Sequence, residues 1–367
     1  MTLREKYDLT QIINAAGTFT PLGVSRSAPE VSKAVAEALG HFYVIDQLQD
    51  TASKALSRWS SAPSGAVTHC VASAITLSIA ATMTGSDAAK IAALPDTTGL
   101  RNEVLIPAGH VVNYGHSILQ AIRLAGAVPI VCGTPEKYSN ADLEKNLTSP
   151  QTACLLLVSS RLVTGEAVDL AASVATAHKA GVPVIIDGAA QDMRICELLD
   201  TGADLVLVSA HKYLSAPTAG LIIGDKQLVH ATNAQEKGIG RAMKASKEAI
   251  IGVLAAIDHR EDMDMDAWRS EQNEKLEWFL EQAALISGIE AKAIPDPVGM
   301  PFSRACLTVA STASVLEVAS IVSSLKNGSP SIRVMESFLA NNEIMLELVP
   351  LTRNELEIIL DHIRQAV

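Results

Sequence analysis

Short, strongly apolar runs alternate with amphipathic segments along the middle of the chain, between about residues 66 and 224. Helical spacing of apolar residues, followed by a glycine, predicts helices in HSILQAIRLAGA and DLAASVATAHKAG. Strands that alternate with helices form a mostly parallel sheet covered on both faces, and ligands bind beyond the carboxyl ends of its strands. The fold class is therefore α/β. The predicted strands are NEVLIPAG, AVPIVCG, TACLLLVSS, GVPVIIDGAA, ADLVLVSA and GLIIG.

A different pattern after about residue 235 predicts a second, smaller α+β domain. DAWRSEQNEKLEWFLEQAAL and RNELEIILDHIRQA have helical spacing, whereas the prolines and glycine of AIPDPVGMP predict a loop. Short strands are predicted in SRACLTVAS, SIRVMES and IMLELVP. We expect three parts: an N-terminal segment over residues 1–30 that packs near the small domain, a large domain over residues 31–245, and an interdomain helix with the small C-terminal domain over residues 246–367.

Composition disfavours several classes of function. The 367 residues carry a formal net charge of -11 and no long basic run, so we expect neither nucleic acid nor an anionic membrane as a partner. No apolar run approaches the roughly 20 residues of a membrane span, and the N-terminus is charged where a signal peptide needs an apolar core. The five cysteines lack metal-ligand spacing, so we expect no metal and a reduced, cytoplasmic chain. These are Cys70, Cys132, Cys154, Cys196 and Cys306.

A carboxylate and a lysine stand at the ends of two consecutive predicted strands. Asp187 ends the run VPVIID, and Lys212 follows ADLVLVSA. One helix-containing crossover between parallel strands brings both side chains to the same edge of the sheet. The alternatives are an aspartate that caps the next turn and a solvated loop lysine. The small residues around Lys212 favour a functional role, because they leave space for a flat ring and a buried amine is costly without a partner.

Pyridoxal phosphate (PLP) requires such a pair. A lysine amine forms its Schiff base, and a carboxylate keeps the pyridine nitrogen protonated so that the ring can accept electrons. We therefore predict PLP as the cofactor and Lys212 and Asp187 as the catalytic residues. Ser209 and His211, in the same segment as Lys212, are further expected cofactor contacts.

The phosphate group needs backbone N–H groups at the start of a helix. Small and polar residues open the apolar segment THCVASAITLSIAATM, although such a start also serves tight packing. The predicted phosphate contacts are Val71, Ala72, Ser73 and Ala74. In PAGHVVNYGHSI, His110 is a candidate planar group over the pyridine ring, with a structural histidine as the alternative, and His116 and Tyr114 are weighed against packing roles.

Three cationic residues are candidates for contact with an acidic substrate or the phosphate. Arg241 and Lys247 lie in GRAMKASKE, where the large sheet gives way to long helices. Arg333 lies in the predicted strand SIRVMES, and a guanidinium there can bind a carboxylate through two hydrogen bonds. For each of the three, the alternative is an ordinary surface charge.

These segments together resemble the selenocysteine synthase (L-seryl-tRNA selenium transferase) family of PLP enzymes and its small-molecule branch, which includes D-glucosaminate-6-phosphate ammonia lyase. The matching stretches are INAAGTFTPLGVSRS, PAGHVVNYGHSILQAIRLAGA, VPVIIDGAAQ, SAHKYLSAPTAGLIIG, GRAMKASKEAIIGVLAAI and, more faintly, GSPSIRVMES. The resemblance implies the aspartate aminotransferase-like fold (PLP fold type I). It aligns the Schiff-base lysine with Lys212, the pyridine-contacting aspartate with Asp187 and the phosphate segment with Val71–Ala74.

The resemblance also implies substrate or phosphate contacts for Arg241 and Lys247 and a carboxylate contact for Arg333. The family's tRNA-using members carry an extra N-terminal region, whereas this chain enters the shared INAAGT stretch by residue 12, which favours the small-molecule branch. The fold implies at least a homodimer, in which Tyr43 or Arg26 of a neighbouring subunit are candidates to enter the cleft.

We expect a PLP-dependent lyase that removes water, or another β-group, and ammonia from a small hydroxyamino acid or aminosugar acid to give a 2-keto acid. An aminotransferase, a racemase or an aldolase acting on a small amino acid shares the first steps and stays an alternative. A non-catalytic binding protein with the same fold is the third hypothesis.

Overall fold

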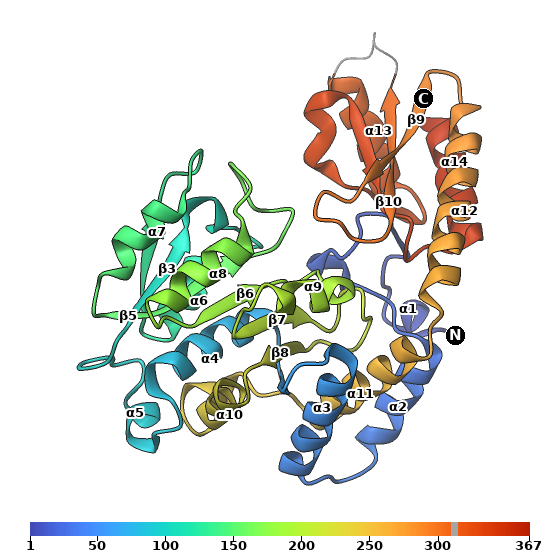
Figure 1. Cartoon of the computed structure of the whole chain (residues 1–367). Helices are drawn as coiled ribbons and strands as arrows, with labels where there is room; N and C mark the ends of the chain where they lie inside the picture. Colours follow the sequence, from blue (N-terminus) through green and yellow to red (C-terminus); the bar gives the residue numbers. More distant parts are fainter. Residues whose placement is uncertain (310–314) are drawn as a thin grey trace. The chain divides into compact units, whose positions relative to one another are not determined.

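The computed structural model describes residues 1–309 and 315–367, and it divides into two compact units (Figure 1). Unit 1 contains Met1–Arg26 and Met263–Val367, and unit 2 contains Ser27–Asp262. The domain boundaries expected after residues 30 and 245 stay a prediction. No helix of the described residues is both long enough and apolar enough to cross a membrane.

A seven-stranded sheet forms the centre of unit 2. Its strand order is β2-β8-β7-β6-β5-β3-β4, in which β8 runs antiparallel to both of its neighbours and the remaining pairs are parallel. The sheet confirms the predicted α/β class and the mostly parallel arrangement. The strands are β2 (Ser64–Thr68), β3 (Glu103–Pro107), β4 (Val128–Cys132), β5 (Thr152–Val158), β6 (Val184–Asp187), β7 (Leu205–Ser209) and β8 (Gly220–Gly224).

Helices cover both faces of this sheet, with α4 and α10 on one side and α8 on the other (Figure 1). Successive residues of each strand point into two different cores: Leu155 and Leu157 of β5 pack with one set of helices, and Leu156 and Val158 with the other. Because both faces are buried, the strands are continuous apolar runs. The helices are α2 (Pro29–Leu39), α3 (Ile45–Ser60), α4 (Val71–Thr84), α5 (Ala88–Ala93), α6 (Ile118–Leu124), α7 (Asn140–Leu147), α8 (Leu170–Lys179), α9 (Ile195–Asp200), α10 (Lys226–Ala234) and α11 (Lys247–Glu261).

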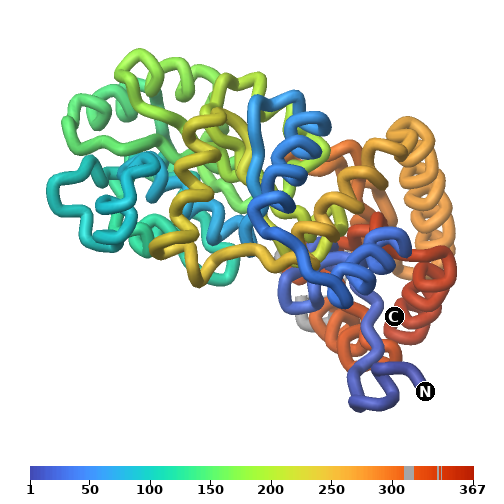
Figure 2. The backbone as a smooth tube through the Cα atoms, turned by 90° about the horizontal axis from the view of Figure 1, so that it is seen from below, coloured from blue at the N-terminus to red at the C-terminus, as the bar shows by residue number. Residues whose placement is uncertain are grey.

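Unit 1 contains a three-stranded antiparallel sheet and a separate parallel pair, β1 with β11. Ile13 of β1 pairs with Ile332 of β11, so the first residues of the chain lie beside its last elements, as the blue and red ends of the tube show (Figure 2). The elements are α1 (Leu3–Lys6), β1 (Ile12–Asn14), α12 (Met265–Ala284), β9 (Ile289–Pro295), β10 (Ser303–Val309), α13 (Val315–Asn327), β11 (Ser331–Arg333), β12 (Glu343–Leu346) and α14 (Arg353–Ala366).

One local prediction in unit 1 was wrong. The segment AIPDPVGMP was predicted as a loop, but its first three residues, Ala293–Pro295, complete β9 by pairing with Ser303–Ala305 of β10. Proline is tolerated there because it stands at the end of the strand. Ala310 and Ser311, the last residues of the predicted strand SRACLTVAS, lie outside the described residues.

Candidate active site

Asp187 and Lys212 lie at the same edge of the large sheet, as their positions at strand ends predict. Asp187 is the last residue of β6, and Lys212 lies just beyond the end of the neighbouring parallel strand β7. Each side chain shifts the pKa of the other. Burial raises the pKa of Asp187 to about 6, an effect that the nearby Lys212 opposes. Burial likewise lowers the pKa of Lys212, and Asp187 opposes that shift.

The Asp187 carboxylate is buried and oriented by the backbone. Its residue is 5% exposed, and Oδ1 accepts a hydrogen bond of 3.0 Å from the N–H of Ala189. A cationic partner strongly stabilises the charged form of a buried carboxylate. The residue is therefore suited to hold a protonated ring nitrogen.

Lys212 is carried by a short loop, residues 210–219, that joins β7 to the antiparallel strand β8. Ser209 and Gly220 are cross-strand partners at the base of this loop. Inside the loop the N–H of Ala210 donates to the Ala219 carbonyl over 3.0 Å, and the N–H of Lys212 donates to the Ser209 carbonyl over 3.3 Å. The backbone that carries the amine is thus held by its own hydrogen bonds.

The predicted phosphate segment forms the N-terminus of α4. No side chain caps this helix and no acidic residue lies in its first turn. The first N–H groups of a helix have no intrahelical acceptor, so those of Val71, Ala72 and Ser73 suit an anion. The N–H of Ala74 differs, because it donates to the Cys70 carbonyl over 2.9 Å. The structure therefore offers three backbone donors where the sequence suggested four.

Gly220 allows β8 to pass against this helix start. A Cβ atom at Gly220 would lie 2.4 Å from the carbonyl carbon and oxygen of Cys70 and 2.9 Å from the nitrogen of Val71. Both neighbours are backbone, so an added methyl group would displace the first turn of α4. The close approach places Ser209, the cross-strand partner of Gly220, next to the same cradle.

Gly220→Ala is expected to weaken PLP binding at least about tenfold, because the displaced backbone N–H groups no longer point at the phosphate. The measurement is a titration of the PLP-free variant with PLP and, in parallel, with pyridoxal, which lacks the phosphate. Pyridoxal affinity should change much less than PLP affinity. Equal losses for both ligands would contradict a phosphate role for this cradle.

His110 lies at the sheet edge beside Asp187 and is held in one tautomer. It ends a 3₁₀ helix, η2 (Ala108–His110), directly after β3, and it is 1% exposed. Its Nδ1 accepts a hydrogen bond of 2.9 Å from the N–H of Val158, the residue of β5 that pairs with Asp187. Burial lowers the pKa of His110 to about 4. The ring is therefore neutral near pH 7, with its proton on Nε2, and its role over the pyridine ring stays a prediction.

Tyr114 provides a test of whether the site fits PLP. Its hydroxyl is buried and has no hydrogen-bond partner within residues 1–309 and 315–367. Burial raises the pKa of Tyr114, and the nearby Asp187 and Cys70 raise it further. A buried hydroxyl without a partner, close to the pyridine-binding and phosphate-binding elements, is consistent with a polar ligand between them. His116 packs edge-on against Tyr114 with ring centroids 4.7 Å apart.

Two other predicted cofactor contacts touch each other. The Oγ atom of Ser209 lies 3.1 Å from Nδ1 of His211, and Ser209 is 1% exposed. Burial lowers the pKa of His211, so this imidazole also favours its neutral form. Both residues lie within three positions of Lys212 in the chain.

The three predicted cationic contacts have different surroundings. Arg241 is exposed, in a segment whose next residues pair with the chain just before α4. The Lys247 amine instead donates to the backbone carbonyls of Leu39, over 3.2 Å, and of His41. Arg333 belongs to unit 1, where its Nε donates to Ser331 Oγ over 3.0 Å. The substrate roles of all three stay predictions.

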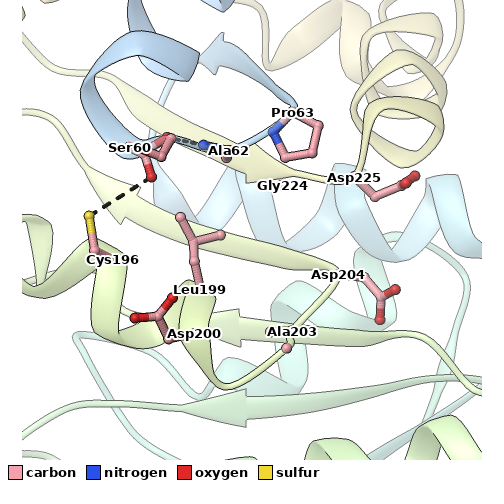
Figure 3. Close-up of a pocket in the computed structure, with 12 residues that line it drawn as sticks. Ser60, Ala62, Pro63, Cys196, Leu199, Asp200, Ala203, Asp204, Gly224 and Asp225 are labelled. Atoms are coloured by element: carbon pink, nitrogen blue, oxygen red, sulfur yellow. Dashed lines mark hydrogen bonds between the residues drawn. The ribbon is translucent and has the colours of Figure 1, made fainter.

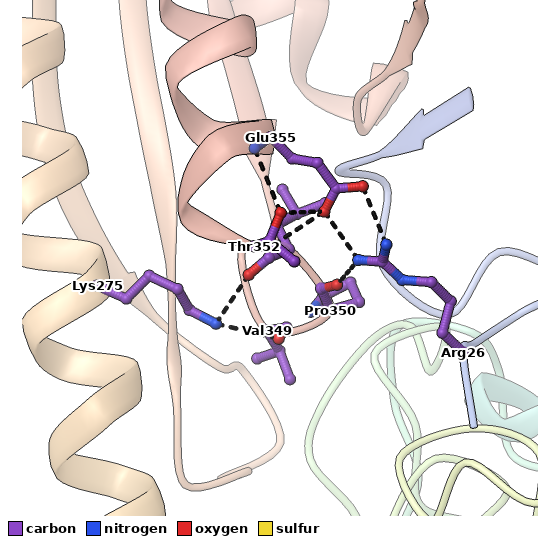
Figure 4. A network of polar contacts seen from close by, with 7 residues as sticks. Arg26, Lys275, Val349, Pro350, Thr352 and Glu355 are labelled. Carbon is purple, nitrogen blue, oxygen red and sulfur yellow. Dashed lines mark hydrogen bonds and ion pairs between the residues drawn. The ribbon is translucent and has the colours of Figure 1, made fainter. Parts of the chain in front are cut away.

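The two residues considered for a neighbouring subunit's cleft are placed as follows. Tyr43 is 36% exposed in the connection between α2 and α3. Arg26 lies in unit 1, where its guanidinium pairs with Glu355 over 2.9 Å and contacts the Pro350 carbonyl (Figure 4). Glu355 also completes the capping box of α14 with Thr352, so Arg26 is joined to the start of that helix.

Sequence reasoning missed Arg161. This exposed residue lies beyond the carboxyl end of β5, and its charge lowers the pKa of Lys212, after the larger effect of burial. The position at a strand end was the available signal, since SSRLVTG directly follows the apolar run of β5. Within the described ranges, no group of three or more His, Cys, Asp or Glu residues is placed to hold a metal ion.

A cavity of about 510 Å³ lies at the opposite edge of the sheet (Figure 3). Ala203 and Asp204, which precede β7, line it together with Cys196 and Asp200 of α9. Asp187 and Lys212 stand at the other ends of their strands. This cavity is therefore separate from the candidate active site.

Residues 102–252 match the family model described as Cys/Met metabolism PLP-dependent enzyme. The chain is 30% identical over 362 residues to D-glucosaminate-6-phosphate ammonia lyase of Salmonella typhimurium, which covers 98% of this chain and 96% of that protein. It is also 30% identical over 324 residues to 5'-C-glycyluridine monooxygenase-decarboxylase of a Streptomyces species, covering 88% of this chain and 81% of that protein. L-seryl-tRNA(Sec) selenium transferase of Solidesulfovibrio magneticus is 30% identical over 269 residues, covering 67% of this chain and 55% of that protein.

Solved structures agree with these sequence relatives. The structure of D-glucosaminate-6-phosphate ammonia-lyase matches with a TM-score of 0.90 at 30% identity, covering 100% of this chain and 98% of that chain. Serine palmitoyltransferase from S. paucimobilis with a bound PLP–myriocin adduct matches with a TM-score of 0.60 at 14% identity, over 96% of this chain and 87% of that chain. The second likeness concerns the fold alone, and together they confirm the predicted PLP fold type I.

Proposed function

This chain belongs to the family of PLP-dependent enzymes that includes D-glucosaminate-6-phosphate ammonia lyase and L-seryl-tRNA selenium transferase, and we propose that it is an ammonia lyase. The predicted family, cofactor and enzyme class are confirmed by these relatives. The observation that carries the proposal is the similarity to an ammonia lyase along nearly the whole of both chains, with Lys212 and Asp187 together at one sheet edge.

The proposed substrate is a small hydroxyamino acid or aminosugar acid with a hydroxyl group on the β-carbon. The α-hydrogen and the β-hydroxyl are lost as water, and hydrolysis of the carbon–nitrogen bond then consumes one water. The net products are ammonium and a 2-keto acid in which one hydrogen has replaced the hydroxyl group on the former β-carbon. No oxidant or reductant takes part in this balance.

Bound PLP would supply an electron-accepting ring that stabilises negative charge at the α-carbon. Asp187 would hold the proton on the ring nitrogen, and its burial strengthens that ionic hydrogen bond. Lys212 would take the α-proton, because its lowered pKa favours the free amine that a base requires. The three N–H groups at the start of α4 would bind the phosphate, and His110 would present a flat neutral ring.

The oligomer, the compartment and the partners belong to the same proposal. We expect a homodimer or a higher homo-oligomer, because active sites of this fold usually lie between subunits. The net charge of -11 supports a small-molecule substrate over a nucleic acid. The five free cysteines support a reducing cytoplasm.

The test is product analysis of PLP-loaded protein with a panel of hydroxyamino acids and aminosugar acids, phosphorylated and unphosphorylated. We expect 2-keto acid and ammonium in equal amounts from at least one compound, without oxygen uptake. The Lys212→Ala protein is the negative control.

Other products would point to other members of the reaction class. Accumulation of the pyridoxamine form would indicate an aminotransferase, and an aldehyde would indicate an aldolase. Oxygen uptake with loss of carbon dioxide would favour a monooxygenase-decarboxylase, the activity that the name of the Streptomyces relative gives. Any of these without equimolar ammonium and keto acid would overturn the lyase proposal.

A further inference from the structure

A buried ion pair joins the two strand-end segments that carry Asp187 and Lys212. Arg260, near the end of α11, pairs through Nη1 with Asp192 Oδ2 over 3.0 Å. Its Nη2 donates to the carbonyl of Tyr213, the residue after Lys212, over 2.6 Å. Asp192 begins the 3₁₀ helix η3 (Asp192–Arg194), which follows the Asp187 segment. One guanidinium therefore links the backbone next to Lys212 to the chain that follows β6.

Both members of this ion pair are buried, and burying charges costs stability. A role at the site would explain why the pair is present. The side chain of Arg260 is 9% exposed and that of Asp192 is 0% exposed. The second carboxylate oxygen, Oδ1 of Asp192, is buried and has no hydrogen-bond partner in the described part of the chain. A buried ion pair seldom adds net stability, and an unpartnered buried oxygen lowers stability further. An exposed pair would have sufficed to hold α11 in place.

The charge of Asp192 reaches the Lys212 amine. Burial is the main influence on the Lys212 amine and lowers its pKa. Asp187 from β6 and Asp192 from η3 oppose this shift, whereas Arg161 beyond β5 adds to it. Conversely, burial raises the pKa of Asp192, while Arg260 and then Lys212 oppose that rise.

We propose that Arg260 and Asp192 are positioning residues for Lys212. The guanidinium fixes the Lys212 loop against the Asp187 segment, and the Asp192 carboxylate stabilises positive charge on the Lys212 nitrogen. With Asp187 holding the ring nitrogen, the Asp192 carboxylate stabilises the lysine after it has taken a proton from the substrate. The inference rests on the proposed function only through Lys212, and it holds for any PLP reaction that uses this amine.

The direct test is a pH titration of the visible absorption of PLP linked to Lys212, without substrate. Asp192→Asn removes a carboxylate whose charge acts on Lys212 and leaves Arg260 without its counter-charge, and both changes disfavour positive charge on the lysine nitrogen. The midpoint at which this nitrogen loses its proton should fall by about one pH unit. The reading does not depend on turnover, so it can succeed even where the lyase proposal fails.

A second variant separates position from charge. Arg260→Lys keeps a cation beside Asp192 but has no second donor in a fixed plane for the Tyr213 carbonyl. Its midpoint should stay within a few tenths of a unit of the wild-type value, whereas PLP release should be several-fold faster. This variant also keeps the proposal testable if Asp192→Asn does not fold.

Arg58→Gln is the matched control, because it breaks an ion-pair cluster at the same end of α11. Arg58 is 56% exposed and contacts Glu261 over 2.7 Å and Asp258 over 3.0 Å. It should change neither the midpoint nor PLP release. An unchanged midpoint in Asp192→Asn, an equal shift in Arg58→Gln, or wild-type PLP release in Arg260→Lys would overturn the proposal.

Discussion

Lys212→Ala is expected to lower kcat for 2-keto acid formation by about 10⁴-fold or more. The variant loses both the amine that links PLP and the base that takes the α-proton. The nearby imidazoles already make contacts: Nδ1 of His110 accepts from the N–H of Val158, and His211 contacts Ser209 Oγ and the Ala219 backbone. The measurement is initial-rate keto-acid production at saturating PLP.

The same variant should still bind PLP without a covalent link, through Asp187 and the start of α4. Its absorption should therefore lack the linked-cofactor band, and borohydride should attach no pyridoxyl group to the protein. Lys226→Ala is the control, because Lys226 is an exposed lysine at the start of α10. Retention of more than about a tenth of wild-type activity by Lys212→Ala would rule out Lys212 as the essential base.

Asp187→Asn is expected to lower PLP binding and turnover but to raise the stability of the PLP-free protein. Burial raises the pKa of Asp187 from 3.8 to about 6 in the folded chain, so the folded state binds this proton more tightly than the unfolded state. The resulting stability is fully present below about pH 4 and is lost as the pH rises through about 6. At pH 8 the ionised carboxylate in the PLP-free protein then costs about 3 kcal/mol, which an asparagine does not.

Urea unfolding of PLP-free wild-type and Asp187→Asn proteins at several pH values measures this effect. The variant should be more stable at pH 8, and its advantage should vanish as the pH falls toward 4, although it binds PLP poorly and turns over slowly. His110, whose pKa is lowered to about 4, makes the same contribution in both proteins and cancels. Asp200→Asn, at an exposed position on α9, is the control. A variant less stable than wild type at pH 8 would contradict the proposed cost of burying Asp187.

The strands of the large sheet were predictable because burial on both faces makes each of them a continuous apolar run. β2 was missed because its residues, SGAVT, are small, and their packing depends on partners far along the chain. The end of β9 was assigned to the loop AIPDPVGMP because proline marks a strand end as well as a loop. The sequence pattern records periodicity but not which neighbour a residue pairs with.

The residues of the candidate site were likewise predicted only in part from the sequence. Asp187 and Lys212 were found because strand ends are visible in the sequence, and the geometry then places them together. The Asp192–Arg260 pair was not found, because its two members lie on η3 and α11, and no local pattern connects these elements. Nor does the sequence reveal that the Nδ1 atom of His110 accepts from Val158, which fixes the tautomer.

The loop of residues 210–219 constrains how proteins of this kind can diversify. Its two ends are locked by the Ser209–Gly220 pair, and its interior is closed by hydrogen bonds, so its length determines where Lys212 stands relative to Asp187. An insertion or deletion of even one residue there would move the reactive nitrogen. The segment after β5 is held less tightly, because residues 161, 162, 166 and 167 are exposed, although the N–H of Thr164 donates to the Gly109 carbonyl over 3.1 Å and Gly165 packs against the backbone of Pro135. Changes in chain length that alter which substrates are accepted should therefore accumulate there and be absent from the lysine loop.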